Sequence, residues 1–467
     1  MKIKVLINIQ DIINGGQGMK QKADVLQDDI LKLFLRYLGA SIASTFMSSM
    51  YILFDTIFIG RGIGSEGLAA LNIALPVYNV IFALGLLSGV GGATVMAINI
   101  GRKKFHVVDK IFTQSMIMAI VFGALITILG SVFIDNLCIF LGATESNFKL
   151  VKDYLSVIIM FNFSFLIVNA LSVFIRNDKA PKLAMWSSII GTIINIVLDA
   201  LFVLVLHLGM RGAALATITG SITSLLILIY FHFIKGKGSL KFVKTKLEIH
   251  TFKRILKNGA PSFIIEVSSG IVIFAFNMVL EDITGTIGIS AYSIIANISL
   301  MCVAIFTGIC QASQPIISTN YGANQMDRVN KVLKMGITFA LFVGVTFFVV
   351  GMFFPRQIVG LFNKDNLELM EITSKGIQLY FIAFIIMGVN IVMGSYFQAI
   401  EYSMIATITS LLRGVVFILL GLFILPNIFA LNGVWLTVPF AEGLALILTI
   451  SLYKKSKGNL NLIKDAA

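Results

Sequence analysis

Several ionisable residues of this sequence lie inside long apolar segments, where a charge is costly to hold. Asp55 stands in MYILFDTIFIG, Asp199 in TIINIVLDALFVL and Glu266 in APSFIIEVSSG. Arg413 and Glu442 lie in two later apolar segments. An ionisable side chain at the middle of a membrane costs at least ~2.5 kcal/mol to insert, so each of these residues is a candidate for function.

Asn195 lies four residues before Asp199, so both side chains fall on one face of a helix. An amide and a carboxyl group at this spacing can share a proton or offer two oxygens to Na⁺. Desolvation favours the protonated form of a carboxyl group. We therefore predict that Asp55, Asn195 and Asp199 bind a coupling ion, either H⁺ or Na⁺. A polar tie between helices, worth ~0.6 kcal/mol, is the alternative for the Asn–Asp pair.

A second group of polar residues lies within apolar segments and is a candidate for substrate binding or for a site in the second half of the chain. Its members are Glu266, Asn72, Asn297, Gln398 and Glu442. Glu266 follows Pro261 by five residues, so the helix start can be loosened beneath it. Arg413 is expected either to reach the membrane surface or to pair with a carboxylate.

Twelve apolar segments are long enough to cross a bilayer, which takes about 20 helical residues. Hydrophobic residues make up 57% of the 467 and charged residues 13%, and the mean hydropathy is +0.94. The composition predicts an all-α integral membrane protein. The expected spans are 30–58, 68–98, 110–134, 153–175, 183–206, 212–234, 258–280, 287–316, 335–354, 376–397, 404–425 and 433–453.

The chain reads as one unit written twice, because glycines recur at a separation of 221 residues. The pairs are Gly64/Gly285, Gly67/Gly288, Gly101/Gly322, Gly123/Gly344, Gly130/Gly351 and Gly212/Gly433. Six spans per half make the two repeats parallel, with a site expected between the lobes. Asp55 and Asp199 have Phe276 and Leu420 as their counterparts, so neither acid is duplicated. A duplicated scaffold with unduplicated acids favours a specific role for those acids over packing.

The net charge of +13 follows membrane topology rather than nucleic-acid binding. With both termini in the cytoplasm, 28 of the 36 Lys and Arg residues fall on the cytoplasmic side. Arg413 lies within a span, and the opposite side holds seven: Arg61, Lys149, Lys152, Arg211, Arg356, Lys364 and Lys375. This bias predicts a multi-pass protein of the plasma membrane with both termini in the cytoplasm. No nucleic-acid partner is expected.

The expected organisation is a cytoplasmic extension at 1–28, an N-lobe at 29–235, a linker at 236–254, a C-lobe at 255–453 and a cytoplasmic tail at 454–467. Met19 begins a segment typical of a cytoplasmic start, and we expect translation to begin there. The basic linker either lies at the headgroup level beside anionic membrane lipid or is a solvated loop.

No motif for enzymatic chemistry is present. Cys138, Cys302 and Cys310 share no metal-ligand spacing, and there is no phosphate-binding loop, zinc motif or nucleophile elbow. The sequence predicts a non-enzyme with no cofactor and no firm metal site, apart from the Na⁺ considered above. ATP is not expected to be the direct energy source.

The sequence resembles the multidrug and toxic compound extrusion (MATE) family over roughly residues 30–455. The matching stretches are FDTIFIGRGIGSEGLAALNIALPV, TIINIVLDALFVLVLHLGMRGAALAT and NYGANQMDRVNKV. The resemblance implies two six-helix bundles around a central cleft and export of varied, often cationic drugs in exchange for H⁺ or Na⁺. It assigns Asp55, Asn195, Asp199 and Glu266 to the family's polar positions. A monomer is expected.

The sequence departs from the family pattern in two places. The first span carries Tyr-Leu-Gly-Ala-Ser where members often have Leu-Ala-Leu-Pro, and the tenth span holds no Asp. A kink at a first-span proline and a Glu–Asp pair in the second lobe are therefore not expected.

Two rival functions remain open. A flippase for lipid-linked precursors needs several cationic residues for a diphosphate, and Arg413 is the one basic residue well inside a span. A sensor or channel needs neither the repeated lobes nor the buried acids.

Overall fold

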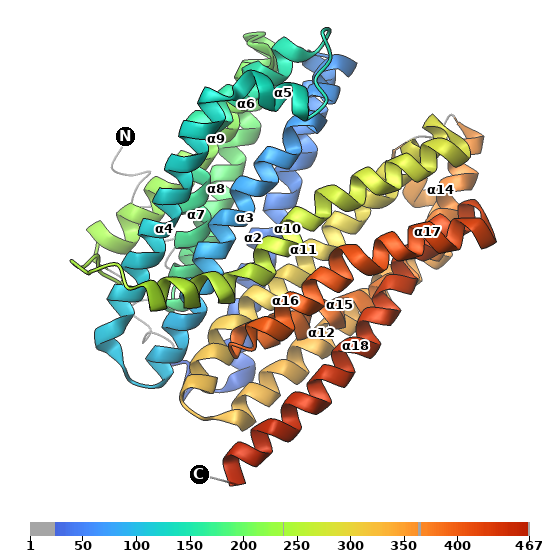
Figure 1. The fold of residues 1–467 in the computed structure, drawn as a ribbon. Coiled ribbons are helices and arrows are strands. Elements are labelled where there is room, and N and C mark those ends of the chain that lie inside the picture. The colour runs from blue at the N-terminus through green and yellow to red at the C-terminus, as the bar shows by residue number, and fades with distance from the viewer. Residues whose placement is uncertain (1–23, 237, 363–365, 466–467) are drawn as a thin grey trace.

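The computed structural model describes residues 24–236, 238–362 and 366–465, and its elements are all helices (Figure 1). The predicted start at Met19 and most of the extension at 1–28 lie outside the described residues. The first half comprises α2 (Ile30–Gly62), α3 (Ser65–Gly101), α4 (Phe105–Val132), α5 (Ile134–Phe140), α6 (Phe148–Met160), α7 (Asn162–Asn177), α8 (Pro181–Asp199), the π-helix η1 (Ala200–Val205), α9 (Gly209–Ile229) and the π-helix η2 (Tyr230–Ile234).

The second half repeats this order. It comprises α10 (Ile249–Thr284), α11 (Thr286–Gly322), α12 (Met326–Phe353), α13 (Pro355–Gly360), α14 (Leu367–Tyr380), α15 (Ile382–Ala399), α16 (Ser403–Leu411), the π-helix η3 (Leu412–Val416), α17 (Phe417–Phe429) and α18 (Leu431–Asp465). Helix α10 begins inside the segment 236–254 that was expected to be a linker.

Helix bounds show the internal repeat at the level of single residues. Ser65 and Thr286, which begin α3 and α11, are 221 residues apart, and so are their last residues, Gly101 and Gly322. Helices α4 and α12 also begin and end at the same offset. Gly64 and Gly285, with φ of 90° and 63°, supply the positive φ before these long helices that other residues adopt only with strain.

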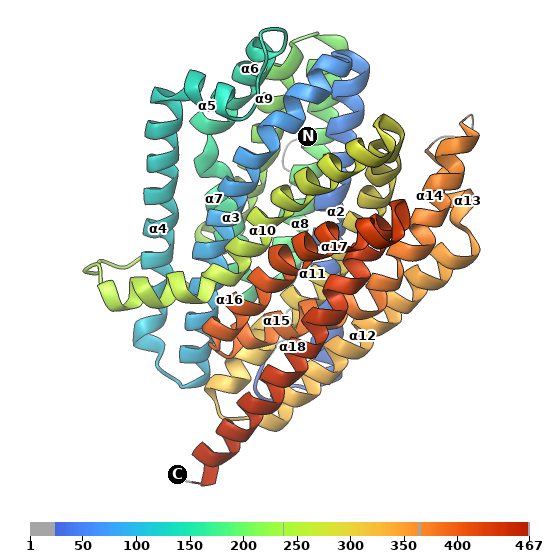
Figure 2. The same cartoon turned by 45° about the vertical axis from the view of Figure 1, so that its right-hand side comes forward.

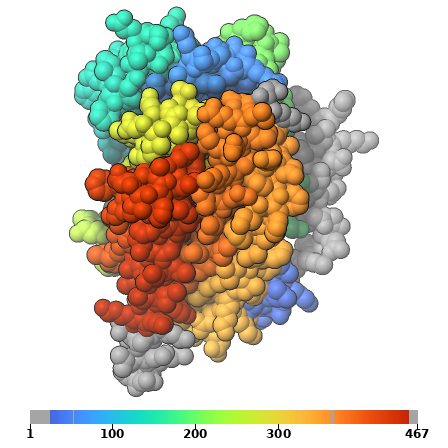
Figure 3. Space-filling model, turned by 90° about the vertical axis from the view of Figure 1, so that its right-hand side faces the viewer, coloured from blue at the N-terminus to red at the C-terminus, as the bar shows by residue number. Residues whose placement is uncertain are grey.

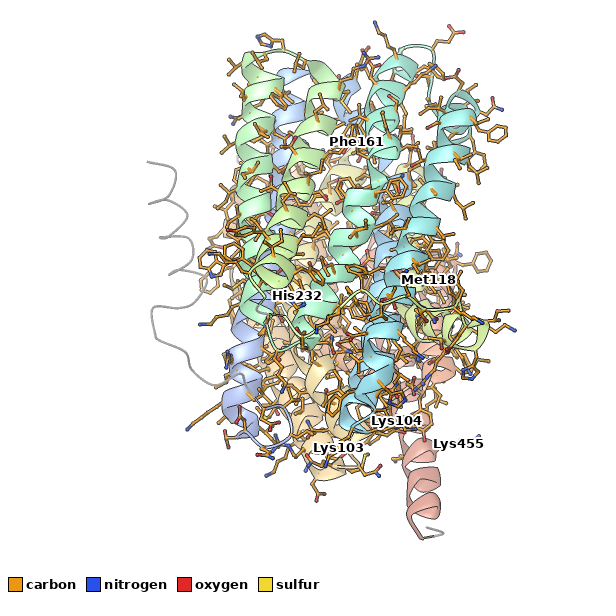
Figure 4. All side chains as sticks on the ribbon, turned by 90° about the vertical axis from the view of Figure 1, so that its left-hand side faces the viewer. Lys103, Lys104, Met118, Phe161, His232 and Lys455 are labelled. Carbon is orange, nitrogen blue, oxygen red and sulfur yellow. The ribbon has the colours of Figure 1, made fainter. Side chains whose placement is uncertain are left out.

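The twelve-span architecture is confirmed. Within the described ranges, eleven helical spans are long and apolar enough to cross a membrane, or up to twelve when a bent pair counts as one span. That pair is α6 and α7, which meet at an angle of 52° beside Phe161 (Figure 4). The fourth expected span is therefore broken rather than straight.

The two lobes meet at one side of the molecule. We call the side where α2 begins and α18 ends the lower side, as drawn in Figure 1, and the lobes diverge toward the upper side. Glycines allow backbone contact between the lobes low in the structure. A Cβ at Gly101 would lie 2.1 Å from the carbonyl oxygen of Thr319, and one at Gly259 would lie 2.0 Å from that of Leu87.

Helix α2 is divided between the lobes. Its lower residues Leu33, Phe34 and Tyr37 are buried in the core of the second lobe, whereas Ile59 near its upper end belongs to the core of the first. Asp55 therefore lies on the part of α2 that packs with the first lobe.

The outer surface is rich in exposed apolar side chains, as expected for contact with lipid. Figure 3 shows the face that the helices of the second lobe form. Phe342, Phe353 and Phe423 are 69%, 71% and 77% exposed. Apolar side chains exposed on this scale require an apolar solvent.

Candidate functional site

The buried acids of the first lobe gather where α2, α8 and α9 pack together. Asn195 and Asp199 lie one helical turn apart on α8, and the amide nitrogen of Asn195 donates a hydrogen bond of 3.0 Å to Oδ2 of Asp199. The same nitrogen lies 3.4 Å from the hydroxyl of Thr217 on α9. Asp55, on α2, interacts electrostatically with Asp199. The structure thus brings the three predicted ion-binding residues together.

Glycines set the position of this pair by letting α8 and α9 cross at close range. A Cβ at Gly220 would lie 2.8 Å from the Cβ of Asn195 and 2.6 Å from the carbonyl oxygen of Gly191. A side chain at either glycine would push the helices apart and move Asn195 away from Thr217. Directly after Asp199 the chain enters the π-helix η1, a distortion that occurs often at functional sites.

Three oxygens of this cluster lack a hydrogen-bond partner within the described part of the chain. They are Oδ1 of Asp55, of Asn195 and of Asp199. Asp55 is 5% exposed and Asp199 is fully buried, and among the described residues neither forms an ion pair with a basic side chain. Buried polar atoms are normally satisfied, so three orphaned oxygens together fit a small cation or a proton.

Three tyrosines complete the cluster, and sequence reasoning missed them. The hydroxyl of Tyr51 on α2 donates a hydrogen bond to that of Tyr78 on α3, and both tyrosines interact electrostatically with Asp55. Tyr154 on α6 interacts electrostatically with both Asp55 and Asp199. Tyr51 lies four residues before Asp55, so helical spacing was a signal that could have placed it on the same face.

In the second lobe, Glu442 is paired with a basic residue. Glu442 on α18 is 4% exposed and accepts hydrogen bonds of 2.9 and 3.0 Å from Nε of Arg413, on the π-helix η3. An Nη nitrogen of Arg413 lies 2.8 Å from Oε1, and the amide of Asn390 donates to Oε2 at 2.7 Å. Of the two expectations for Arg413, pairing with a carboxylate is confirmed.

The other candidates differ in their surroundings, and Glu266 adjoins the first-lobe cluster. Glu266 on α10 is half-buried and interacts electrostatically with Tyr78 of the first lobe. Asn72 and Asn297 are exposed, and the amide of Asn297 donates to the carbonyl oxygen of Ser293 at 2.8 Å. Gln398 is buried and donates to the carbonyl oxygen of Asn258 at 2.7 Å, so it ties α15 to α10.

Parallel six-span lobes, with a cluster of unpaired buried oxygens in one of them, define a two-lobed membrane transporter rather than an enzyme. The MatE family model matches residues 40–201 and 261–423, one match in each lobe. The chain therefore belongs to the MATE family of transporters.

Similar proteins and solved structures agree with this family assignment. The multidrug export protein MepA of Staphylococcus aureus (strain MRSA252) is 26% identical over 427 residues, covering 90% of this chain and 92% of that protein. MepA of Staphylococcus haemolyticus (strain JCSC1435) is 25% identical over 439 residues, covering 94% and 96%.

Two structures show the shared fold. A multidrug resistance MATE family transporter of the MOP superfamily, in an outward-facing conformation, has a TM-score of 0.89 at 22% identity and covers 95% of this chain and 100% of that chain. A MOP superfamily transporter from Pyrococcus furiosus Vc1 (DSM3638) has a TM-score of 0.88 at 23% identity, with the same coverage.

Proposed function

We propose that this protein is a secondary active antiporter that exports chemically diverse, often cationic compounds in exchange for H⁺ or Na⁺. The observation that carries the proposal is the set of orphaned oxygens on Asp55, Asn195 and Asp199. Membership of the MATE family and the similarity to multidrug export proteins support the class of cargo.

The ion site acts by binding its cation more tightly in one arrangement of the lobes than in the other. A ligand shifts a conformational equilibrium only through such a difference in affinity. Helix α2 supplies the link, because its lower half packs in the core of the second lobe and its upper half carries Asp55. Binding of the cation at Asp55 would bias how α2 sits against α8, and with it how the lobes rock.

The proposed membrane arrangement follows the distribution of basic residues. The lower side, where α2 begins and α18 ends, faces the cytoplasm of a plasma-membrane protein. The functional lobes correspond to 29–235 and 255–453, and the protein acts as a monomer. A substrate-binding site or a second-lobe site is proposed for four further residues: Glu266, Asn72, Asn297 and Gln398. Glu266 is included because it lies near Tyr78.

A flippase for lipid-linked precursors is the second candidate, since it shares the superfamily fold. Its diphosphate cargo needs several free cationic groups at membrane depth. Arg413 lies at that depth, but its guanidinium is already engaged by Glu442. That pairing favours the antiporter.

Transport in vesicles with an imposed proton or Na⁺ gradient, one at a time, tests the proposal. One gradient should drive efflux of a cationic dye, and Asp199→Asn should abolish that dependence. Asp135→Asn is the matched control, because Asp135 pairs with Lys152 on the surface with its side chain 57% exposed. Efflux by Asp199→Asn that equals the control at equal expression would overturn the assignment.

A further inference from the structure

A small hollow with polar and apolar walls lies on the lower side where the two lobes meet. It has a volume of ≈110 Å³, and its walls come from α3, α4 and the first turns of α10. Asn99, Val107 and Lys110 line it from the first lobe, and His250 and Arg254 from the second. We call this cavity the lower hollow.

The internal repeat places a counterpart of the lower hollow beside α11, α12 and the start of α2. Asn320 is the counterpart of Asn99, 221 residues later. The amide nitrogens of both residues donate a hydrogen bond of 2.8 Å to the carbonyl oxygen four residues earlier. The two asparagines therefore present their side-chain oxygens in the same way.

In the second lobe an arginine fills this place. Arg328 donates from Nε to Oδ1 of Asn320 at 2.8 Å, and from Nη2 to the carbonyl oxygens of Val25 at 3.1 Å and Asp28 at 2.8 Å. The counterpart of Arg328 in the first lobe is Val107. The valine is too short to reach this place. No described residue donates a hydrogen bond to Oδ1 of Asn99, which stays accessible from the lower hollow.

The rim of the lower hollow is basic. Lys110 has no ion-pair partner among the described residues, and His250 is exposed. Arg254 is fixed in place by Glu401, which accepts from Nε at 2.7 Å and from Nη2 at 2.6 Å. Glu248 is the one carboxylate of the lining. Because Arg254 is already paired, Lys110 is the lining cation that is left free, among the described residues, to contact an anion beside Asn99.

The lower hollow lies beside apolar side chains suited to a membrane surface. Phe242, Leu247 and Ile249 are 61%, 61% and 73% exposed. The first turns of α10 run sideways past α4 before the helix rises (Figure 2). Met118 of α4 lies near the level of these turns, well above Lys103 and Lys104 at the tip of the α3–α4 turn (Figure 4). Apolar and basic side chains together are typical of the headgroup region.

The segment before α10 is held against α4 by hydrogen bonds. The backbone nitrogen of Lys241 donates to Oδ1 of Asp109 at 2.9 Å, and that of Val243 donates to the hydroxyl of Thr113 at 3.1 Å. Gln114 donates to the carbonyl oxygen of Lys246 at 3.1 Å. These hydrogen bonds fix the segment before α10 against α4, and that segment leads into one wall of the lower hollow. The contacts argue against a solvated loop over residues 241–246.

We propose that the lower hollow binds the headgroup of a membrane phospholipid. The phosphate lies against Lys110 and His250, and a hydroxyl or ammonium group of the headgroup donates to Asn99 where Arg328 donates to Asn320 in the other lobe. Because the walls belong to both lobes, the bound lipid stabilises the arrangement in which the lobes meet on the lower side. The site is independent of the proposed drug transport.

Native mass spectrometry of the purified protein tests this proposal by counting lipids retained from vesicles of known composition. Phosphatidylglycerol and phosphatidylethanolamine should be retained, and phosphatidylcholine, whose headgroup lacks a donor, should bind roughly tenfold more weakly. Lys110→Gln removes a charge-assisted contact and should lower retention roughly tenfold. Lys331→Gln, the same change at the counterpart position in the second lobe, should leave it unchanged.

Val107→Arg places in the first lobe the arginine that the second lobe has at the counterpart position, Arg328. The new side chain should fill the lower hollow and abolish lipid retention. Should that variant fail to fold, the exposed pair Lys110→Gln/His250→Gln replaces it. Equal retention of all three lipids in every variant would overturn the proposal. Displacement of the lipid by free glycerol phosphate at equal concentration would also overturn it, because the site would then bind a soluble anion.

Discussion

In the first lobe, Asp55 and Asp199 each keep an oxygen without a hydrogen-bond partner, whereas in the second lobe both oxygens of Glu442 are bound by Arg413 and Asn390. The helices around them follow one repeated plan. The backbone plan therefore does not decide where a mobile cation can bind. The charge of Glu442 is neutralised by Arg413 of the same lobe, whereas Asp55 and Asp199 have no basic partner among the described residues.

The same asymmetry recurs on the lower side. Arg328 donates to Asn320 in the second lobe, whereas Val107 makes no such bond to Asn99 in the first, and both residues line the lower hollow. In both places an arginine of the second lobe binds a polar side chain, although Glu442 is not the counterpart of Asp55 or Asp199 in the repeat.

The largest expected effect is on the stability of the second lobe. Glu442→Gln leaves the guanidinium of Arg413 buried without a counter-charge, and breaking a buried pair in this way costs about 3–5 kcal/mol. The melting temperature in detergent should fall by several degrees. The double variant Arg413→Met/Glu442→Leu should recover most of the loss. A melting temperature unchanged by Glu442→Gln would show that the pairing of Glu442 with Arg413 does not stabilise the second lobe, and would contradict the contrast drawn between the two lobes.

Asp199→Asn should have the opposite profile, with stability kept and ion binding weakened. An asparagine satisfies the cluster without a charge, so folding has little to lose. The apparent affinity for the coupling ion should fall by roughly 100-fold, the upper end of what a hydrogen bond to a charged group contributes. Gradient-driven dye efflux at varied ion concentration measures it. A destabilised variant with normal affinity would mean that the first-lobe acid is structural.

Asn195→Ala should have a smaller effect in the same direction. The variant removes the 3.0 Å hydrogen bond to Asp199 and an oxygen of the proposed ion site. Affinity for the coupling ion should fall about tenfold, corresponding to ~1.5 kcal/mol. Asn390→Ala, which removes a donor to Glu442, is the matched variant in the second lobe and should leave ion affinity unchanged. Equal losses in both variants would contradict the asymmetry.

Tyr78→Phe should have the smallest effect. It removes only the hydroxyl that accepts from Tyr51, and a polar contact between membrane helices averages ~0.6 kcal/mol. The apparent ion affinity should change about threefold, measured by the same efflux assay. A complete loss of transport would show that the tyrosine pair binds the ion or the cargo directly.

Much of this molecule was predictable because its signals are local or periodic. Hydropathy predicted the twelve spans, glycine spacing predicted the repeat, and the four-residue interval predicted the contact between Asn195 and Asp199. The break at Phe161 and the π-helices beside Asp199 and Arg413 were not predicted. Such distortions depend on packing against neighbouring helices and leave no composition signal.

Contacts between segments far apart in the sequence could not be predicted either. The pairing of Arg413 with Glu442 required knowing how α18 faces η3, and the division of α2 between two cores required the lobes' relative placement. Asn99 and Asn320 occupy equivalent positions in the sequence, but only the structure shows that one of them is satisfied by an arginine.

Cation binding to the purified protein tests the central claim most directly. Isothermal titration with Na⁺, and proton release upon binding of a cationic dye, should each be compared in two double variants. The account predicts that Asp55→Asn/Asp199→Asn abolishes the binding seen in the wild type, and that Arg413→Met/Glu442→Leu retains it. Binding that survives the first pair of substitutions and disappears with the second would contradict the account.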